Sequence, residues 1–252
     1  AGKVIVNGGD MTVNGLTVGR GGNGVSVTNA NTTFGINALS SSSTSGSGAN
    51  TAIGNSVLSA NTSGSKNTGL GFFALNANVT GTDNTAVGYY ALRANNSSSS
   101  DNTAIGSNAL YSNTSGTENT AVGSGSLNKN TSGNQNSVLG RYAYFNGEGS
   151  YNTAVGYRAL MSPNAAGNTG EFNVSMGYYS GYSLTTGSQN VFLGPHAGFN
   201  NTTGGKNIML GSNAGYYFSN STDGTNGINS TGNGSVFIGY DVRPKANNET
   251  NT

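Results

Sequence analysis

A five-residue unit with a large apolar side chain at one fixed place recurs along most of the chain. It reads Asn, Thr, a small residue, a large apolar residue and Gly, as in NTAVG at 84–88 and NTAIG at 102–106. Twelve copies occur between residues 31 and 239, most often 17 residues apart. Repetition at a short fixed period is typical of a solenoid, in which each copy forms one rung that is not stable alone.

Alternation within the unit predicts a short β-strand. The second position is Thr or a β-branched apolar residue in nearly every copy and the fourth is always large and apolar, so the two share one face. The third position is most often Ala but becomes Phe192, Met209 and Phe237 near the end. Both faces of the strand are therefore predicted to be at least partly buried, as in covered parallel sheets. No stretch keeps a 3.6-residue apolar period free of Gly for three turns, so no helix is predicted.

The rest of each rung is predicted to contain a turn, a second strand and a closing turn. The Gly at position five permits a backbone turn that a Cβ would resist. A second short strand is expected at Ala then Leu, as in Ala91 and Leu92. Asn and Gly then close the rung. These closing turns are NTSG at 61, 113 and 130, NVTG at 78 and NTTG at 201.

The fourth-position residues are predicted to form an interior ladder, which is the structural core of the solenoid. They share a large apolar side chain and the same phase of the repeat. After Phe34 in the first copy, they are Ile53, Leu70, Val87, Ile105, Val122, Leu139, Val155, Met176, Leu193, Leu210 and Ile238.

One rung contributes too few large apolar residues to fill a broad single-chain β-helix, whereas three chains sharing an axis would bury the second strand face. The predicted fold class is therefore all-β, a parallel β-roll or β-helix solenoid of rungs of about 17 residues, assembled as a homotrimeric fibre. Residues 1–30 are predicted to be an N-terminal β segment. Residues 31–252 are predicted to be about twelve rungs, with a long insertion at 216–234.

Composition narrows the possible partners. The 252 residues include 42 glycines and only 8% charged residues, which argues against an ordinary globule with its own core. A net charge of +1 is too small to favour binding to nucleic acid or to an anionic membrane, so neither is predicted as a partner. No apolar run is long enough for membrane insertion. The absence of cysteine excludes disulfides, thiol catalysis and thiolate metal sites.

The unit NTAxGxxAL with its NTSG turn resembles the repeats of bacteriophage tail fibres, and it is similar to the head repeats of trimeric autotransporter adhesins. The resemblance covers residues 31–252. It implies a homotrimeric, extracellular β-roll or β-helix on a virion tail fibre or a bacterial cell surface. The function it implies is structural: attachment to a host or other surface through a cell-surface saccharide or protein receptor.

Candidate chemistry is sparse, and a non-enzymatic protein with no cofactor and no metal is predicted. His196 is the one histidine and sits in the turn sequence GPHAG, while TDGTNG at 222–227 lacks the acidic spacing of an EF-hand. The carboxylates are scattered, and the repeat places no pair for glycosidase chemistry. A polysaccharide-degrading, tailspike-like enzyme stays an alternative, because contacts between chains could assemble an acidic pair.

Aromatic residues are the predicted receptor contacts. Many follow the repeat Gly, where their rings either bind sugars or pack over neighbouring rungs. Three successive rungs replace the Leu at position nine with Gly181, Gly198 and Gly215, and an aromatic residue follows each. These rings are predicted to form a ladder that either fills the space left by Leu or turns outward. Together with the start of the insertion they give the predicted receptor-binding set, with interchain packing as the alternative: Tyr182, Phe199, Tyr216, Tyr217 and Phe218.

Two further patterns have weaker implications. Regular Thr rows occur on ice-binding solenoids, so an ice-binding solenoid is another alternative. However, Thr at position two gives way to Val191 and Ile208 and shares the face of the predicted core residue, which argues against an exposed Thr array. Lys66 and Asp83 occupy one position on successive rungs and are predicted to pair at a solvated edge.

Overall fold

The computed structural model describes residues 11–13, 16–19, 31–41, 48–96, 99–164, 167–216 and 232–242. These residues form short strands joined by turns, and none of them is helical, so no helix there is long and apolar enough to cross a membrane. The chain divides into two compact units, Ala1–Glu118 and Asn119–Thr252. The boundary falls between two rungs of the repeat region.

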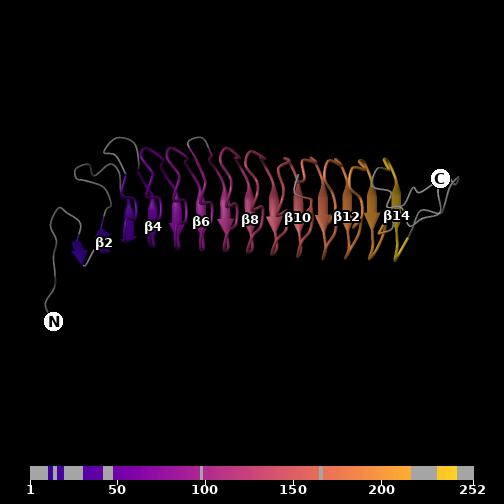
Figure 1. Cartoon of the computed structure of the whole chain (residues 1–252), viewed down its shortest axis with the longest axis horizontal. Coiled ribbons are helices and arrows are strands. Elements are labelled where there is room, and N and C mark those ends of the chain that lie inside the picture. Colours follow the sequence, from indigo (N-terminus) through magenta and orange to yellow (C-terminus); the bar gives the residue numbers. More distant parts are fainter. Residues whose placement is uncertain are drawn as a thin grey trace. The chain divides into compact units, whose positions relative to one another are not determined.

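In the first unit an antiparallel start leads into a parallel stack (Figure 1). Strand β1 pairs antiparallel with β2, which pairs antiparallel with β3. From β3 onward each strand pairs in parallel with the next, and equivalent positions of the repeat lie side by side, as with Ile53 and Leu70. The strands are β1 Met11–Val13, β2 Leu16–Gly19, β3 Thr32–Gly35, β4 Thr51–Ile53, β5 Thr68–Leu70, β6 Thr85–Val87 and β7 Thr103–Ile105.

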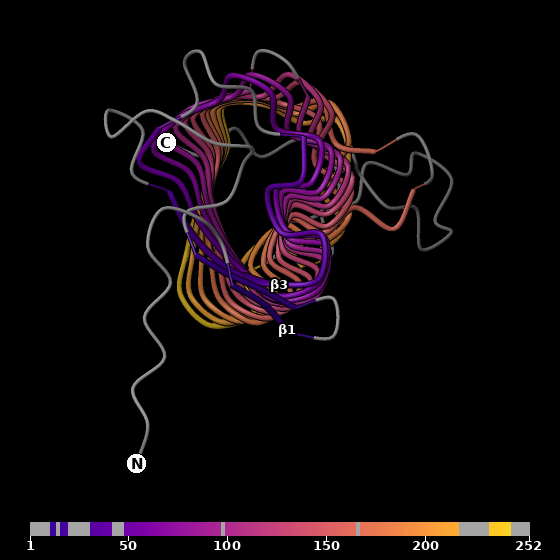
Figure 2. The ribbon, with the colours of Figure 1, turned by 90° about the vertical axis from the view of Figure 1, so that its left-hand side faces the viewer.

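The second unit is a parallel stack throughout its described strands. Each pairs with its sequence neighbour at equivalent positions of the repeat. The predicted all-β parallel solenoid with rungs of about 17 residues is thus confirmed, and within each unit the rungs follow nearly the same outline (Figure 2). The strands are β8 Thr120–Val122, β9 Ser137–Leu139, β10 Thr153–Val155, β11 Val174–Met176, β12 Val191–Leu193, β13 Ile208–Leu210 and β14 Val236–Ile238.

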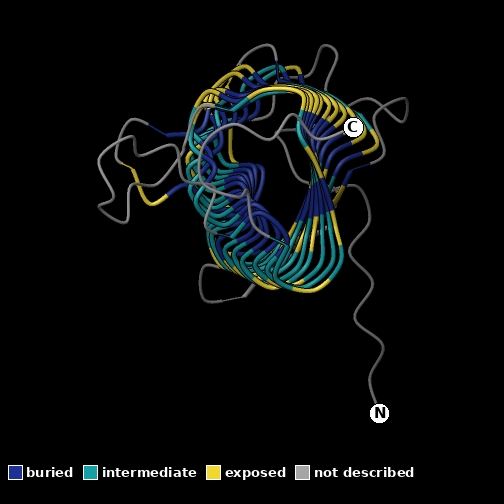
Figure 3. Ribbon diagram, turned by 90° about the vertical axis from the view of Figure 1, so that its right-hand side faces the viewer, coloured by how far each residue is buried: buried dark blue, intermediate teal, exposed yellow. Residues whose placement is uncertain are grey.

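The strand face that points into the rung is the opposite of the one predicted. The third-position Ala86 and Ala104 are fully buried, whereas the fourth-position Ile105 is 40% exposed, Leu139 51% and Ile238 66%. Burial classes run as continuous stripes from rung to rung (Figure 3). The prediction that the fourth position forms the interior of the chain is therefore wrong. The outward, partly or largely exposed residues are Ile53, Leu70, Val87, Ile105, Val122, Leu139, Val155, Met176, Leu193, Leu210 and Ile238.

The interior is narrow, which explains the inversion. A small third-position side chain faces in and leaves room for the Leu at position nine, which enters the core from the opposite side of the rung and is fully buried, as at Leu92. The two-residue period of a strand identifies residues that share a face but does not tell which face is inside.

The Ala–Leu segment is a turn and not the predicted second strand. Ala91 and Leu92 are both fully buried, although neighbours in a strand would point to opposite faces. A left-handed backbone at Leu92, with φ of 48°, turns both side chains inward. That conformation costs about 1–2 kcal/mol. Burial of a Leu side chain contributes about 1.5–3 kcal/mol, so burial outweighs the strain.

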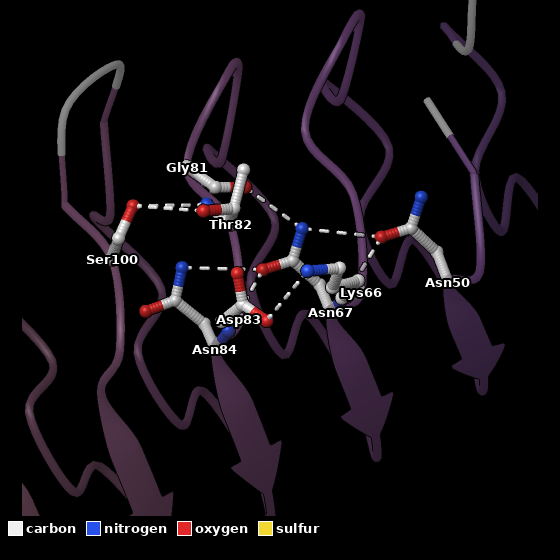
Figure 4. Close-up of polar contacts among 8 residues, drawn as sticks. All are labelled: Asn50, Lys66, Asn67, Gly81, Thr82, Asp83, Asn84 and Ser100. Atoms are coloured by element: carbon white, nitrogen blue, oxygen red, sulfur yellow. Dashed lines mark hydrogen bonds and ion pairs between the residues drawn. The ribbon is translucent and has the colours of Figure 1, made fainter. Parts of the chain in front are cut away.

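The first-position asparagines form a buried ladder, a role that the sequence analysis did not assign to them. Asn67 Nδ2 donates to Asn50 Oδ1 at 3.1 Å and to the Gly81 carbonyl at 2.8 Å. Asn67 Oδ1 accepts from Asn84 N at 3.1 Å and from Asn84 Nδ2 at 3.2 Å (Figure 4). The Asn67 amide thus uses two donors and two acceptor sites, a set that Asp and Leu do not offer.

The closing turns are as predicted, since Asn and Gly hold them together. Asn61 Nδ2 donates to the Gly64 carbonyl at 2.9 Å, and Asn78 Nδ2 donates to the Gly81 carbonyl at 3.1 Å. Asn78 Nδ2 also donates to Asn61 Oδ1 at 3.0 Å, so the turns of adjacent rungs are bonded to each other. A second buried amide ladder therefore runs beside the first.

The fifth-position glycines are required by both backbone and space. Gly54 has φ of 129°, and a Cβ there would collide with the carbonyl of Gly71 on the next rung. The predicted turn at this position is confirmed, and the rungs approach one another there through bare backbone.

One rung of the second unit replaces both core Leu and turn Asn. Tyr144 stands in the Leu position and Gly147 in the turn Asn position. The fully buried Tyr144 hydroxyl accepts from Asn152 Nδ2 at 2.8 Å and from Gly149 N at 3.1 Å. Burial raises the pKa of Tyr144 well above its ordinary value, although the hydrogen bond from Gly149 opposes the rise. The phenol therefore takes over the hydrogen bonding of the missing amide.

Candidate binding surface

The predicted aromatic ladder is present in the second unit. The rings of Tyr182 and Phe199 stack with centroids 5.0 Å apart and planes 15° apart. Phe199 and Tyr216 stack at 5.0 Å and 21°. All three side chains are half-buried. Tyr217 and Phe218, the other two predicted receptor contacts, lie outside the described residues.

The ladder does not fill the space left by Leu. A Cβ at Gly181 or Gly198 would collide with the ring of Phe192, and one at Gly215 would collide with the side chain of Met209. Large third-position residues therefore take the volume of the missing Leu. Of the two alternatives predicted for the rings, filling the space left by Leu is therefore ruled out. The stacked rings are instead partly accessible to solvent.

The ladder belongs to a larger surface, which we call the aromatic band. Tyr179 contacts Tyr182 at 4.9 Å between centroids, and Tyr157 stacks on Tyr178 at 5.6 Å and 16°. His196 lies 5.4 Å from Tyr178 in an edge-on contact. His196 lies in a turn, as predicted, and its ring packs against the neighbouring aromatic rings. The aromatic band consists of Tyr142, Phe145, Tyr157, Tyr178, Tyr179, Tyr182, His196, Phe199 and Tyr216.

Two arginines lie against the aromatic band. Arg158 Cζ is 5.2 Å from the Tyr157 ring centroid and 5.5 Å from that of Tyr179, and its Nη1 donates to the Tyr179 hydroxyl at 2.8 Å. Arg141 Cζ is 4.8 Å from the Tyr142 centroid. At these distances each guanidinium makes cation–π contacts with the rings of the band.

The first unit carries a smaller cluster of the same kind. Phe72 and Tyr89 stack at 5.5 Å and 8°. Arg93 lies 5.2 Å from the Tyr90 centroid, and its Nη1 donates to the Tyr111 hydroxyl at 2.7 Å. Among the described residues, each unit thus contains an arginine that donates to a tyrosine of the next rung.

A second surface, which we call the outer strand face, consists of the second and fourth positions of the strands. Thr32, Thr68 and Thr120 are exposed on it, beside the exposed fourth-position residues. The prediction that this Thr row is not exposed is wrong, because the face thought to be internal points outward. The row ends at Val174, from which the second position is aliphatic.

Among the described ionisable side chains, one exposed ion pair is formed. Lys66 Nζ lies 3.7 Å from Asp83 Oδ1 and both side chains are largely exposed, so the predicted solvated pair is confirmed. In the described part of the chain, no three His, Asp or Glu side chains gather where they could hold a metal ion. The aromatic band and the outer strand face are thus the candidate surfaces.

Comparison of the chain with protein-family models, with curated proteins and with solved structures finds no match. A proposal for the function therefore rests on the geometry of the aromatic band and the outer strand face.

Proposed function

We propose that the chain is a structural segment of an extracellular fibre or adhesin, on a phage tail or a bacterial surface, that assembles as a parallel homotrimer and mediates attachment. The observation that carries this is the outer strand face. Large apolar side chains stand outward on every described rung of both units. Soluble proteins rarely leave a contiguous apolar surface of this extent uncovered.

A second copy of the chain is the partner that fits this face. Its rungs recur at the same spacing, so its own apolar row matches rung for rung when the chains run parallel. A partner with another period would lose register within a few rungs. Rotation about an axis along the stack then closes the assembly. Three chains, and not two, follow from the resemblance of NTAxGxxAL to fibre and adhesin repeats.

In this proposal the trimer is a scaffold and attachment occurs at the aromatic band. Rings and loops on a rigid scaffold are common places for recognition. The partner is a host cell-surface saccharide or protein, and the chain has no catalytic role and needs no cofactor.

Three aspartate substitutions in one rung test the assembly. Ile105→Asp, on the outer strand face, is expected to leave the β-sheet circular dichroism unchanged and to abolish the trimer, because each interface then buries an unpaired charge. Ser107→Asp is the matched control off that face and is expected to leave the trimer intact. Ala104→Asp points inward and is expected to unfold the rung. An Ile105→Asp variant that stays trimeric in sedimentation would rule out this face as the interface.

The exposed Thr row supports a second candidate, ice binding by the outer strand face. Thr85 and its equivalents lie at one position on successive rungs, which gives a flat and regular array. Inhibition of ice recrystallisation by the wild type, lost in Thr85→Lys with the fold intact, would favour this candidate. The trimer proposal expects no such inhibition, because copies of the chain cover the face.

A further inference from the structure

The aromatic band is continuous along the second unit. Ring contacts and the guanidinium of Arg158 link Tyr142 to Tyr216 without a break. The band covers five successive rungs, so four steps of about 4.8 Å give roughly 19 Å. Tyr178 is 50% exposed and the other rings of the band are half-buried. A surface of this shape suits a long, narrow ligand that lies along the stack.

The charge of the aromatic band is positive. Arg141 and Arg158 lie on it, whereas the acidic residues between 141 and 216 are Glu148 and Glu171, both in closing turns. Glu148 Oε2 accepts from Thr131 N at 3.1 Å and from Thr131 Oγ1 at 2.8 Å. Arg158 uses one of its five N–H groups in a hydrogen bond within the described chain. The Arg158 Nε is buried, so the protons that remain for an anionic ligand are those of the Nη groups.

We propose that the aromatic band binds a linear acidic polysaccharide whose sugar rings stack on tyrosine faces and whose carboxylates bind Arg141 and Arg158. This rests on the proposed attachment function and names the ligand class. Flat rings suit the apolar faces of sugars, and a guanidinium binds a carboxylate in a two-pronged contact. A single-stranded nucleic acid would also stack on the rings. However, it carries a phosphate at every step, and the band offers two arginines.

The experiment is affinity electrophoresis of the whole chain through native gels that contain polygalacturonate, alginate or hyaluronate. The parallel gel contains methyl-esterified polygalacturonate, which keeps the sugar rings and loses the charge. We expect at least one acidic polysaccharide to retard the protein, and its neutral ester to retard it far less. No retardation by any of the three would overturn the proposal.

Variants assign the binding to the aromatic band. Arg158→Gln and Tyr178→Ser are each expected to weaken retardation about tenfold, since hydrogen bonds to charged groups and stacked rings contribute on that scale. Lys129→Gln is the matched control, because Lys129 is exposed in the same unit and off the band. Wild-type retardation of Arg158→Gln, or retardation by single-stranded poly(U) equal to that by polygalacturonate, would contradict the proposal.

The oligomeric state of each variant is measured on the same samples by sedimentation. If the protein is a monomer and acidic polysaccharide still retards it, the proposed site is supported and the proposed trimer is contradicted. If the protein is a trimer and no acidic polysaccharide retards it, the proposed assembly is supported and the proposed site is contradicted.

Discussion

At the scale of the residue, the interior depends on pairs of positions that change together. The commonest combination is Ala at position three with Leu at position nine, as at Ala104 and Leu110. The rung that begins at Asn190 combines Phe192 with Gly198, whose missing side chain leaves room for the ring. Gly at position nine also relieves the left-handed strain that Leu bears there. The interior is thus filled in both cases, in one by a large side chain at position nine and in the other by a large side chain at position three.

This pairing predicts strong coupling between Phe192 and Gly198. Phe192→Ala is expected to cost about 3–5 kcal/mol of unfolding free energy through the cavity it leaves. Gly198→Leu is expected to cost about 1–3 kcal/mol or more through overpacking. The double variant restores the common Ala and Leu pattern, so its cost should fall below the sum by at least about 1 kcal/mol. Denaturant unfolding of all four proteins measures this, and strict additivity would refute the exchange of volume.

Tyr144 predicts a dependence on alkaline pH. Its pKa is raised by burial in the folded protein, so the folded state holds the proton more tightly than the unfolded state. The contribution to stability is full below the unfolded pKa of about 10 and is lost as pH rises above it. The stability difference between wild type and Tyr144→Phe should therefore shrink above about pH 10. A difference that stays constant from pH 7 to 11 would contradict a buried neutral phenol.

At the scale of the element, rungs are joined by amides as well as by strands. The strands are only three or four residues long, so each contributes few ladder hydrogen bonds. Two buried asparagine ladders add bonds between rungs and within them. An amide such as that of Asn67 uses both its Nδ2 protons and its Oδ1, so its loss leaves several buried groups without a partner at once.

Asn67→Ala is therefore expected to be costly for a single polar substitution. It removes partners from Asn50, Gly81 and Asn84, all buried. At about 1–3 kcal/mol for each buried group left without a partner, the loss of unfolding free energy should be about 3 kcal/mol or more. Lys66→Asn is the control next to it in the chain. That change breaks only the exposed pair with Asp83, for which about 1 kcal/mol or less is expected. Similar costs for the two in thermal or denaturant unfolding would show that the amide ladder contributes little.

Repetition allowed much of the fold to be predicted from the sequence, and the errors have physical reasons. Rung length, strand positions and Asn–Gly turns follow from spacing and turn chemistry. The inner face could not be predicted in this way, because Ala86 and Val87 are both apolar and only the narrowness of the interior selects the smaller. The buried ladder had a signal that went unused, since Asn occupies the first position in eleven of the twelve copies. The stacked rings of Tyr182 and Phe199 were predictable from rung spacing. The contacts of Arg141 and Arg158 with the neighbouring rings were not, because the two arginines stand at different positions of the repeat.

At the scale of the whole molecule, the proposal predicts kinetic stability. Each rung is bonded to its neighbours, and in the trimer every outer strand face is covered, so unfolding must expose many contacts together. We expect the assembled protein to persist as a trimer in detergent until it is heated. Gel mobility with and without heating measures this. Immediate dissociation at room temperature would favour three loosely associated solenoids.

The mass of the wild-type protein in solution tests the central claim most directly. Sedimentation equilibrium over a range of concentrations gives this mass without assumptions about shape. If the apolar row of the outer strand face is the interface, the mass is three times the 25.3 kDa of one chain and does not fall on dilution. A mass of 25.3 kDa at every concentration would leave the row uncovered and would contradict the account.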